Sequence, residues 1–115
     1  MSLTTRAVVL DRCSVVTVEG ELDLVTADQL WEELTEVLAG HHAPLVLDLA
    51  ELGFCDSVGL AVLVRAHNAL QSRGQRLVIA RPTPMVDRIL QVSGLNQAIT
   101  SVPDVDAAIA RAGEP

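Results

Sequence analysis

The sequence predicts a single α/β domain: a mixed, mainly parallel sheet of four or five strands with about four helices packed mostly on one face. Three observations lead to this prediction. The chain has 115 residues, which is the usual size of one domain. Hydrophobic residues make up 50% of it and are nearly all aliphatic. Short β-branched segments also alternate with segments of helical periodicity, as in parallel sheets joined by right-handed crossovers.

The N-terminal third is expected to form a hairpin followed by a helix. Residues 6–10 and 14–19 are β-branched segments separated by a short polar turn, which favours two antiparallel strands. Apolar residues then recur at the helical period over 27–40. Thr26 and Gln29 have the spacing of a capping box, in which each side chain satisfies a free amide at the helix start. We also expect the single tryptophan of this helix to be partly buried.

The middle of the chain predicts a strand, a loop and a second helix. Residues 45–49 form a short apolar strand, and 50–57 are expected to form a loop. The helix should run over 57–73. Its first two turns are apolar on almost every face, which indicates a buried start, whereas its second half is polar.

The C-terminal third predicts two further strand and helix pairs. A strand is expected over 76–80, followed by a helix that opens at Pro84, a residue suited to the first helical position. A short strand over 97–100 and an amphipathic helix over 103–112 complete the domain. We therefore expect one domain over 1–115, with an ordered core over about 5–112. The buried stripe of the third helix is expected to comprise Met85, Val86, Ile89, Leu90 and Val92.

Composition and charge exclude several classes of function. The 8 basic residues against 15 acidic ones give a net charge of −7, which opposes binding to the phosphates of a nucleic acid. Aromatic residues make up only 2% of the chain, so few side chains can stack on bases. Direct nucleic-acid binding is therefore not expected. No apolar run reaches the length that spans a bilayer, and the first residues do not have the layout of a signal peptide. Two cysteines far apart in sequence favour a reduced, cytoplasmic protein without membrane contact.

The segment from Asp48 to Leu63 carries the clearest functional signal. An apolar strand leads into a loop that presents Ser57 at the start of a buried helix, where free amides and the helix dipole favour an anion such as a phosphate group. An alternative reading is purely structural, because Asp56 or Ser57 can serve simply as the helix cap.

The other polar side chains are poor candidates for a catalytic, metal-binding or redox site. Ser57 lacks the nucleophile elbow of hydrolases, and nothing places a histidine base beside it, so an enzyme is not expected. The adjacent His41 and His42 have no third ligand nearby, and we predict no metal and no cofactor. Cys55 lies next to Asp56, whose charge disfavours a reactive thiolate, and is expected to be a small apolar filler.

Several short motifs resemble, in order and spacing, those of the bacterial anti-sigma factor antagonist family, which is built on the STAS domain. The resemblance covers nearly the whole chain. The D-S-x-G-L element that follows an apolar strand is the most specific of them, and the others are weak when taken alone. The motifs are Gly20-Glu21-Leu22-Asp23, Leu45-Val46-Leu47-Asp48-Leu49, Leu52-Gly53-Phe54-Cys55-Asp56-Ser57-Val58-Gly59-Leu60, Val86-Asp87-Arg88-Ile89-Leu90 and Ser93-Gly94-Leu95.

The resemblance implies a regulatory function and assigns residues to it. In that family the serine after the motif aspartate, here Ser57, is phosphorylated by a partner that is both anti-sigma factor and serine kinase. The unmodified antagonist binds this partner and frees the sigma factor, the phosphorylated form releases the partner, and a serine phosphatase resets the system. The resemblance also implies two supporting groups of residues: Asp56, Val58 and Gly59 around the phosphate, and Glu21, Asp23, Ser57 and Leu60 in the partner surface.

One departure from the family keeps a second function open. The family often has a second Ser or Thr where this chain has Val58, so Ser57 is the only hydroxyl in the motif. The alternative function is therefore a STAS scaffold, or a lipid-transport accessory subunit, without a phosphate switch. In either case we expect a monomer or a weak dimer when the protein is free of its partner.

Overall fold

Six strands and four α-helices follow one another in residues 2–114, which are the residues that the computed structural model describes. The expected domain span of 1–115 includes residues 1 and 115, which lie outside this described range. The elements, in chain order, are β1 (Leu3–Val9), β2 (Ser14–Leu22), α1 (Ala27–Gly40), β3 (Leu45–Asp48), β4 (Leu52–Cys55), α2 (Ser57–Gln71), β5 (Leu77–Ala80), α3 (Pro84–Ser93), a 3₁₀ turn η1 (Leu95–Gln97), β6 (Thr100–Val102) and α4 (Val105–Ala112).

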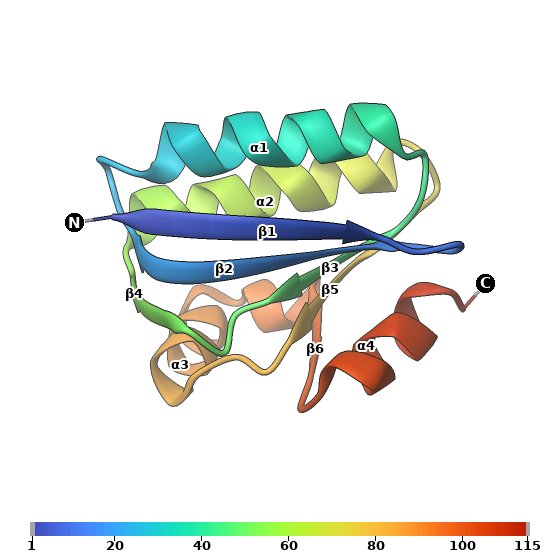
Figure 1. The fold of residues 1–115 in the computed structure, drawn as a ribbon. Helices are drawn as coiled ribbons and strands as arrows, with labels where there is room; N and C mark the ends of the chain where they lie inside the picture. Colours follow the sequence, from blue (N-terminus) through green and yellow to red (C-terminus); the bar gives the residue numbers. More distant parts are fainter. Residues whose placement is uncertain (1, 115) are drawn as a thin grey trace.

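The strands form one mixed sheet in the order β1-β2-β3-β5-β6, and β4 pairs with β2 off this path. Only the β1–β2 hairpin is antiparallel among the pairs in the described chain, since β2–β3, β2–β4, β3–β5 and β5–β6 are all parallel. The predicted α/β class and the mixed, mainly parallel sheet are therefore confirmed. The hairpin supplies the antiparallel edge (Figure 1).

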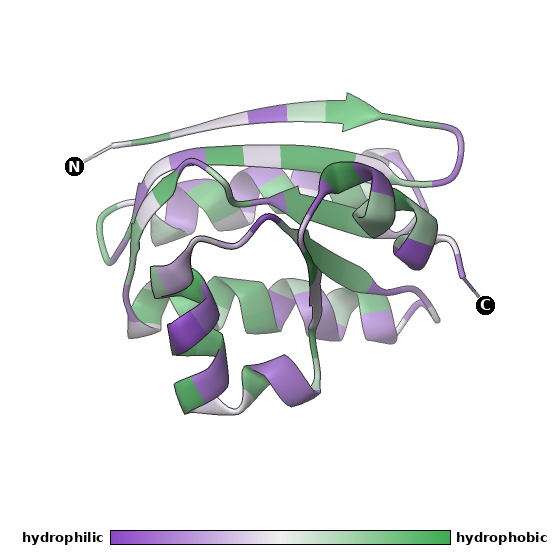
Figure 2. Cartoon of the chain, turned by 90° about the horizontal axis from the view of Figure 1, so that it is seen from below, coloured by the Kyte–Doolittle hydropathy of each residue, from purple (hydrophilic) through white to green (hydrophobic). Residues whose placement is uncertain are grey.

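The sheet is covered unequally on its two faces. Helices α1 and α2 lie side by side over one face, and α4 lies against the other (Figure 1). Residues of α3 belong to the same large core as α1 and α2, so most helices pack on one face, as predicted. The central strands β3 and β5 are buried at every position and are mostly green in Figure 2, whereas the helices alternate between green and purple.

Strand β4 corrects the expectation that 50–57 is a loop. The four residues of β4 pair with the end of β2, with Leu52 opposite Gly20 and Cys55 opposite Leu22. A four-residue segment without alternation carries no strand signal of its own, and here the pairing partner decides the structure. The sheet consequently has six strands rather than four or five.

Three local predictions are also wrong. Thr26 makes no side-chain cap on α1, because its hydroxyl donates to the Glu21 carbonyl at 2.7 Å, while Gln29 donates to the Leu3 carbonyl at 3.0 Å; there is no capping box. Val92 is 79% exposed and does not belong to the buried stripe of α3. The last strand lies at 100–102 rather than 97–100, because a 3₁₀ turn occupies 95–97.

The prediction for Trp31 is confirmed. Its side chain is half-buried on α1 and packs against the core, and the Arg65 guanidinium of α2 lies 4.1 Å from the ring centroid. This cation–π contact joins the two helices on their outer side.

Candidate functional site

Asp56 connects the end of β4 to the start of α2 and holds the backbone of both. Its amide donates to the Leu22 carbonyl at 3.2 Å, and its carboxylate accepts from the Gly59 amide at 2.9 Å. Asp56 is therefore the N-cap, and Ser57 is the first residue of the helix. The Ser57 side chain is exposed, and its hydroxyl has no hydrogen-bond partner among residues 2–114. The serine is thus presented to solvent beside the positive end of the α2 dipole.

Gly59 allows α2 to approach β2 more closely than any other residue would. A Cβ atom at this position would lie 2.5 Å from Cγ of Leu22 and 2.7 Å from its carbonyl oxygen. Leu22 is fully buried, and a backbone oxygen cannot move without disturbing the sheet. Gly59 therefore sets the position of the helix start, and with it the position of Ser57.

The turn between β2 and α1 is organised by Asp23. This side chain is buried, and its carboxylate accepts from the amides of Val25 at 2.9 Å and Thr26 at 3.1 Å. The Asp23 amide in turn donates to the Thr26 hydroxyl at 3.0 Å. Because all of these polar groups bond within the turn, the two residues between Asp23 and Thr26 are turned outward.

Five large hydrophobic side chains are exposed on the segments that adjoin Ser57, and we call them the apolar rim. They come from the turn after β2, from β4 and the start of α2, and from the end of α3, which lines a groove with Ser57. Their exposure lies between 39% and 79%, and exposed apolar groups gathered on neighbouring segments are typical of an interaction surface. The rim comprises Leu24, Val25, Phe54, Val58 and Val92.

A groove of about 430 Å³ runs between the start of α2 and α3 beside the rim. Ser57 and the half-buried Leu60 line one side, and Ile89, Val92 and Arg88 line the other. Arg88 is exposed and forms no ion pair within the described part of the chain. The serine hydroxyl therefore shares a mainly apolar groove with one cationic side chain.

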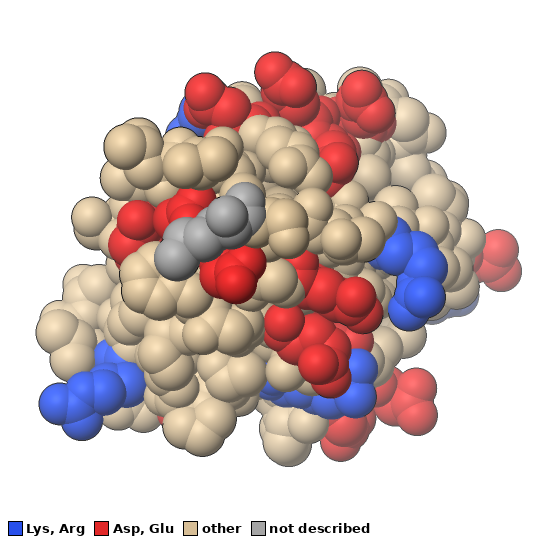
Figure 3. Space-filling model, turned by 60° about the vertical axis from the view of Figure 1, so that its left-hand side comes forward, with Lys and Arg blue, Asp and Glu red and all other residues tan. Residues whose placement is uncertain are grey.

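The face that carries this site is rich in carboxylates. Figure 3 brings that end of the molecule forward and shows carboxylates along its upper edge and across its middle, with few basic side chains at the margins. Glu21 is among the nearby acids; it is half-buried, and its carboxylate accepts from the Ser2 amide at 3.1 Å. A partner that combines apolar and basic groups matches this surface best.

Two neighbouring groups are structural rather than reactive. Cys55 is buried, and burial followed by the Asp56 carboxylate raises the pKa of its thiol to about 11, which agrees with the expected inert filler. Asp48, at the end of β3, accepts two hydrogen bonds from Arg81, at 3.1 and 2.6 Å. The Asp48 carboxylate, followed by the charge of Glu51, raises the pKa of the Arg81 guanidinium. Residues 2–114 contain no group of three metal-ligating side chains.

The structure thus brings the sequence-predicted residues together at one end of the sheet but gives them different exposures. Ser57 and Val58 are exposed, Leu60 and Glu21 are half-buried, and Asp23 and Gly59 are buried. Sequence reasoning missed the apolar rim apart from Val58, and it also missed Arg88 as a groove residue. Two features of the sequence could have indicated the rim: the adjacent apolar residues Leu24 and Val25 in a turn, and the single phenylalanine, Phe54.

Comparison with known proteins places the chain in a family. The family model described as "Mlab, STAS domain" matches residues 7–103. The anti-sigma F factor antagonist of Paenibacillus polymyxa is 32% identical over 82 residues, which span 70% of each chain. No helix within residues 2–114 is long and apolar enough to cross a membrane.

Solved structures agree with this fold. The crystal structure of an anti-sigma factor antagonist from Mycobacterium paratuberculosis is 31% identical, has a TM-score of 0.89, and aligns over 98% of this chain and 96% of its own. The Bacillus cell fate determinant SpoIIAA in its phosphorylated form has a TM-score of 0.72 at 21% identity, over 94% of this chain and 98% of its own. The second likeness concerns the fold alone.

Proposed function

The chain belongs to the STAS domain family, and on this premise we propose that it is an anti-sigma factor antagonist switched by phosphorylation of Ser57. In its unmodified form the protein binds an anti-sigma factor that is also a serine kinase, and this frees the sigma factor for transcription. Phosphorylation by that partner releases the antagonist, and a serine phosphatase restores it. The protein acts in the cytoplasm as a regulator and not as an enzyme. The relatives, which are named as antagonists of anti-sigma factors, support this assignment.

The exposed, unpaired hydroxyl of Ser57 is the observation that carries the proposal. Asp56 caps the helix, so Ser57 has no structural task that a phosphate would interrupt. The kinase transfers the γ-phosphoryl group of ATP to Oγ, ADP leaves, and the hydroxyl proton passes to a base of the kinase. The amides of the first turn favour the resulting negative charge.

The apolar rim and the groove supply the binding surface in this proposal. Leu60 and Glu21 border it, while Asp23 acts from inside the turn by holding Leu24 and Val25 outward. Apolar groups of this kind contribute most of the affinity of protein interfaces, and the surrounding carboxylates favour a basic partner.

The phosphate acts on the interface rather than on the fold. It adds about −1.5 to −2 charge units, which the helix dipole stabilises by about 0.3–1 kcal/mol and the neighbouring Asp56 opposes by a similar amount. Ser57 lies in a mainly apolar groove, so binding would bury this charge in a dehydrated apolar contact, apart from the basic groups that face the surrounding carboxylates; this costs several kcal/mol. Because about 1.4 kcal/mol corresponds to tenfold in affinity, a loss of 100-fold or more is expected.

Val58 favours a second candidate function. It leaves Ser57 as the only hydroxyl of the motif, and its apolar side chain extends the rim instead. A constitutive STAS scaffold, or a lipid-transport accessory subunit, would use the same surface without a phosphate switch.

Intact-mass analysis after incubation with ATP and the kinase separates the two functions. The kinase for this test is a cognate anti-sigma factor with serine-kinase activity, to be sought as a histidine-kinase-like ATPase reading frame next to the gene of this protein. The proposal predicts the mass of one phosphoryl group on the wild-type chain and on Ser93→Ala, a control in the same groove, and none on Ser57→Ala. Stable binding of the partner without any transfer to Ser57 would establish the scaffold instead.

A further inference from the structure

Arg88 is a cation of α3 that the fold leaves unused. Its side chain is exposed, and it forms no hydrogen bond or ion pair among residues 2–114. Other arginines do have an interaction within the chain, namely Arg65, Arg73, Arg76, Arg81 and Arg111. A chain with 15 acidic residues offers many carboxylates, yet Arg88 pairs with none in the described part. Its guanidinium is therefore available to a group that the unmodified protein lacks.

The side chain of Arg88 borders the same groove as Ser57, from the opposite wall. Arg88 and Val92 are one turn apart on α3, and both line the groove. Ser57, at the start of α2, lines the facing side and is also exposed. A phosphoryl group added to Ser57 would therefore enter a space of about 430 Å³ that a guanidinium already borders.

Two acidic residues adjoin Arg88, and each makes a hydrogen bond elsewhere. Asp56 lines the same groove, and its carboxylate accepts from the Gly59 amide at 2.9 Å. Asp87 precedes Arg88 on α3; its carboxylate accepts from the Gln91 side chain at 3.2 Å, and it lines a different pocket. Neither carboxylate forms an ion pair with Arg88. The unmodified groove thus holds a cation without a counterion in the described chain.

We propose that Arg88 pairs with the phosphate group of phosphorylated Ser57 and thereby closes the groove between α2 and α3. This inference rests on the proposed phosphorylation of Ser57. A guanidinium donates two parallel hydrogen bonds to phosphate oxygens, and such charge-assisted pairs are among the strongest polar contacts. The pair spans the groove over Leu60 and Ile89, which line its walls.

The pairing gives phosphorylation a second effect on the binding surface, besides the added charge. In the unmodified protein the groove beside Leu60 and Ile89 is open to an apolar side chain of a partner. In the phosphorylated protein the partner must break the ion pair or bury it without water, and both are unfavourable. Arg88 therefore acts as the residue that receives the phosphate and holds it across the groove.

Phosphorus-31 NMR of the full chain with phosphoserine at position 57 tests the pairing. Phosphoserine is incorporated during translation, so no kinase is needed. The second ionisation of phosphoserine has a pKa of about 6. Because a neighbouring cation favours the doubly charged form, Arg88→Gln should raise this pKa by about 0.5 relative to the wild-type chain. Thermal unfolding of the variant checks that it is folded.

Other groups that face the phosphate do not interfere with this titration. Asp56 and Arg88 are the charged residues in the described lining of the groove. The Cys55 thiol also lines it, but burial and the Asp56 charge raise the pKa of this thiol to about 11, far above the interval in which phosphate titrates.

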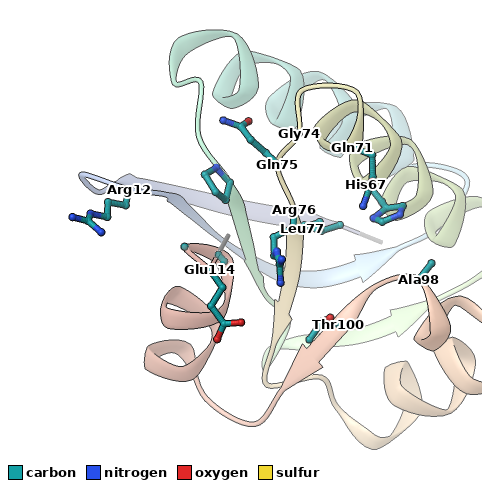
Figure 4. A pocket seen from close by; sticks show the side chains of 13 residues that line it. Arg12, His67, Gln71, Gly74, Gln75, Arg76, Leu77, Ala98, Thr100 and Glu114 are labelled. Atoms are coloured by element: carbon teal, nitrogen blue, oxygen red, sulfur yellow. The ribbon is translucent and has the colours of Figure 1, made fainter.

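Two further variants separate a local pair from a general effect of charge. Arg12 extends from the turn between β1 and β2 at the edge of another cavity, at the opposite end of the sheet from Ser57 (Figure 4). Arg12→Gln makes the same change of net charge and should move the phosphate pKa by less than about 0.1. Arg88→Lys keeps the charge without the planar fork and should restore about half of the difference.

Proton–nitrogen NMR observes the pair directly. The Nε–Hε signal of Arg88 should move downfield when position 57 carries phosphate, as expected of a donor to an anion, and that of Arg12 should stay in place. An unmoved Arg88 signal would overturn the proposal. So would an equal phosphate pKa in the wild type and Arg88→Gln, or an equal rise in Arg12→Gln and Arg88→Gln. These results leave the proposed function intact, which fails instead when the kinase transfers no phosphoryl group to Ser57.

Discussion

Asp56 and Ser57 are neighbours at the start of α2, yet their side chains face in different directions and serve different purposes. The Asp56 carboxylate bonds inward to the Gly59 amide, whereas the Ser57 hydroxyl has no partner in the described chain. The same division holds across the site. An inner layer of Leu22, Asp23, Asp56 and Gly59 is bonded or tightly packed, and it holds an outer layer, the apolar rim with Ser57, that makes few contacts.

This comparison teaches that stability and recognition depend on different residues only a few ångströms apart. Polar groups of the inner layer are satisfied within the chain, so their loss should destabilise the protein. Groups of the outer layer face solvent, so their loss should leave stability nearly unchanged and weaken only the binding of a partner. Each prediction below tests one side of this division.

Gly59→Ala should cause the largest loss of stability, about 3 kcal/mol, because the added methyl group overlaps both the side chain and the carbonyl oxygen of Leu22. Urea unfolding measures the change. Gly40→Ala is the matched control: nothing lies within 4 Å of a Cβ at that position, and its stability should stay equal or rise slightly. Similar stability of the two variants would show that the helix start is not held by this contact.

Asp23→Ala should lose about 2 kcal/mol, because the amides of Val25 and Thr26 lose their acceptor. Asp28→Ala, an exposed acid in the first turn of α1, should lose less than about 1 kcal/mol. Chemical denaturation of both variants gives the difference. An equal effect would mean that Asp23 acts through its charge and not through its hydrogen bonds.

Asp56→Ala and Ser57→Ala compare the two neighbours directly. The first removes the cap of α2 and should cost about 1 kcal/mol, whereas the second removes an unpaired hydroxyl and should change stability by less than about 0.5 kcal/mol. Thermal unfolding curves of both variants and the wild type at one pH measure these changes in stability. A larger loss in Ser57→Ala than in Asp56→Ala would reverse the assignment of cap and phosphoacceptor.

Cys55 contributes no pH dependence at neutral pH. Its thiol has a pKa raised to about 11 in the folded protein, from an ordinary value of 9.0, so the folded state favours the protonated form. The resulting stability is complete below about pH 9 and is lost as the pH rises towards 11. In a Cys13→Ala background, Cys55→Ala should therefore flatten the decline of stability over this interval. An unchanged slope would show that Cys55 is not the titrating group.

The sequence predicted those elements whose signals are local. Pro84 and Gly94 bound a helix whose apolar residues repeat at the helical period, and the structure places its start and end at these residues. Ser57 could be found because a strand, two good capping residues and an apolar helix follow one another. The identity of the cap could not be decided, since Asp56 and Ser57 are equally suited to it by residue type.

What the sequence could not predict depends on partners distant in the chain. Strand β4 exists through its pairing with β2, and the Thr26 hydroxyl turns to the Glu21 carbonyl instead of capping α1. Val92 fits a helical stripe in sequence, but the core contacts Val86 and Leu90, so Val92 faces the groove. The apolar rim likewise arises only when three separate segments meet.

The central claim is that phosphorylation of Ser57 acts on partner binding and leaves the fold intact. Calorimetric titration of the kinase with Ser57→Asp, paired with a thermal unfolding curve, tests it most directly. The account predicts a melting temperature within about 4 °C of wild type and an affinity reduced by about 100-fold or more, while Ser57→Ala binds as the wild type does. A collapse of stability in Ser57→Asp, or full kinase binding by that variant, would contradict it.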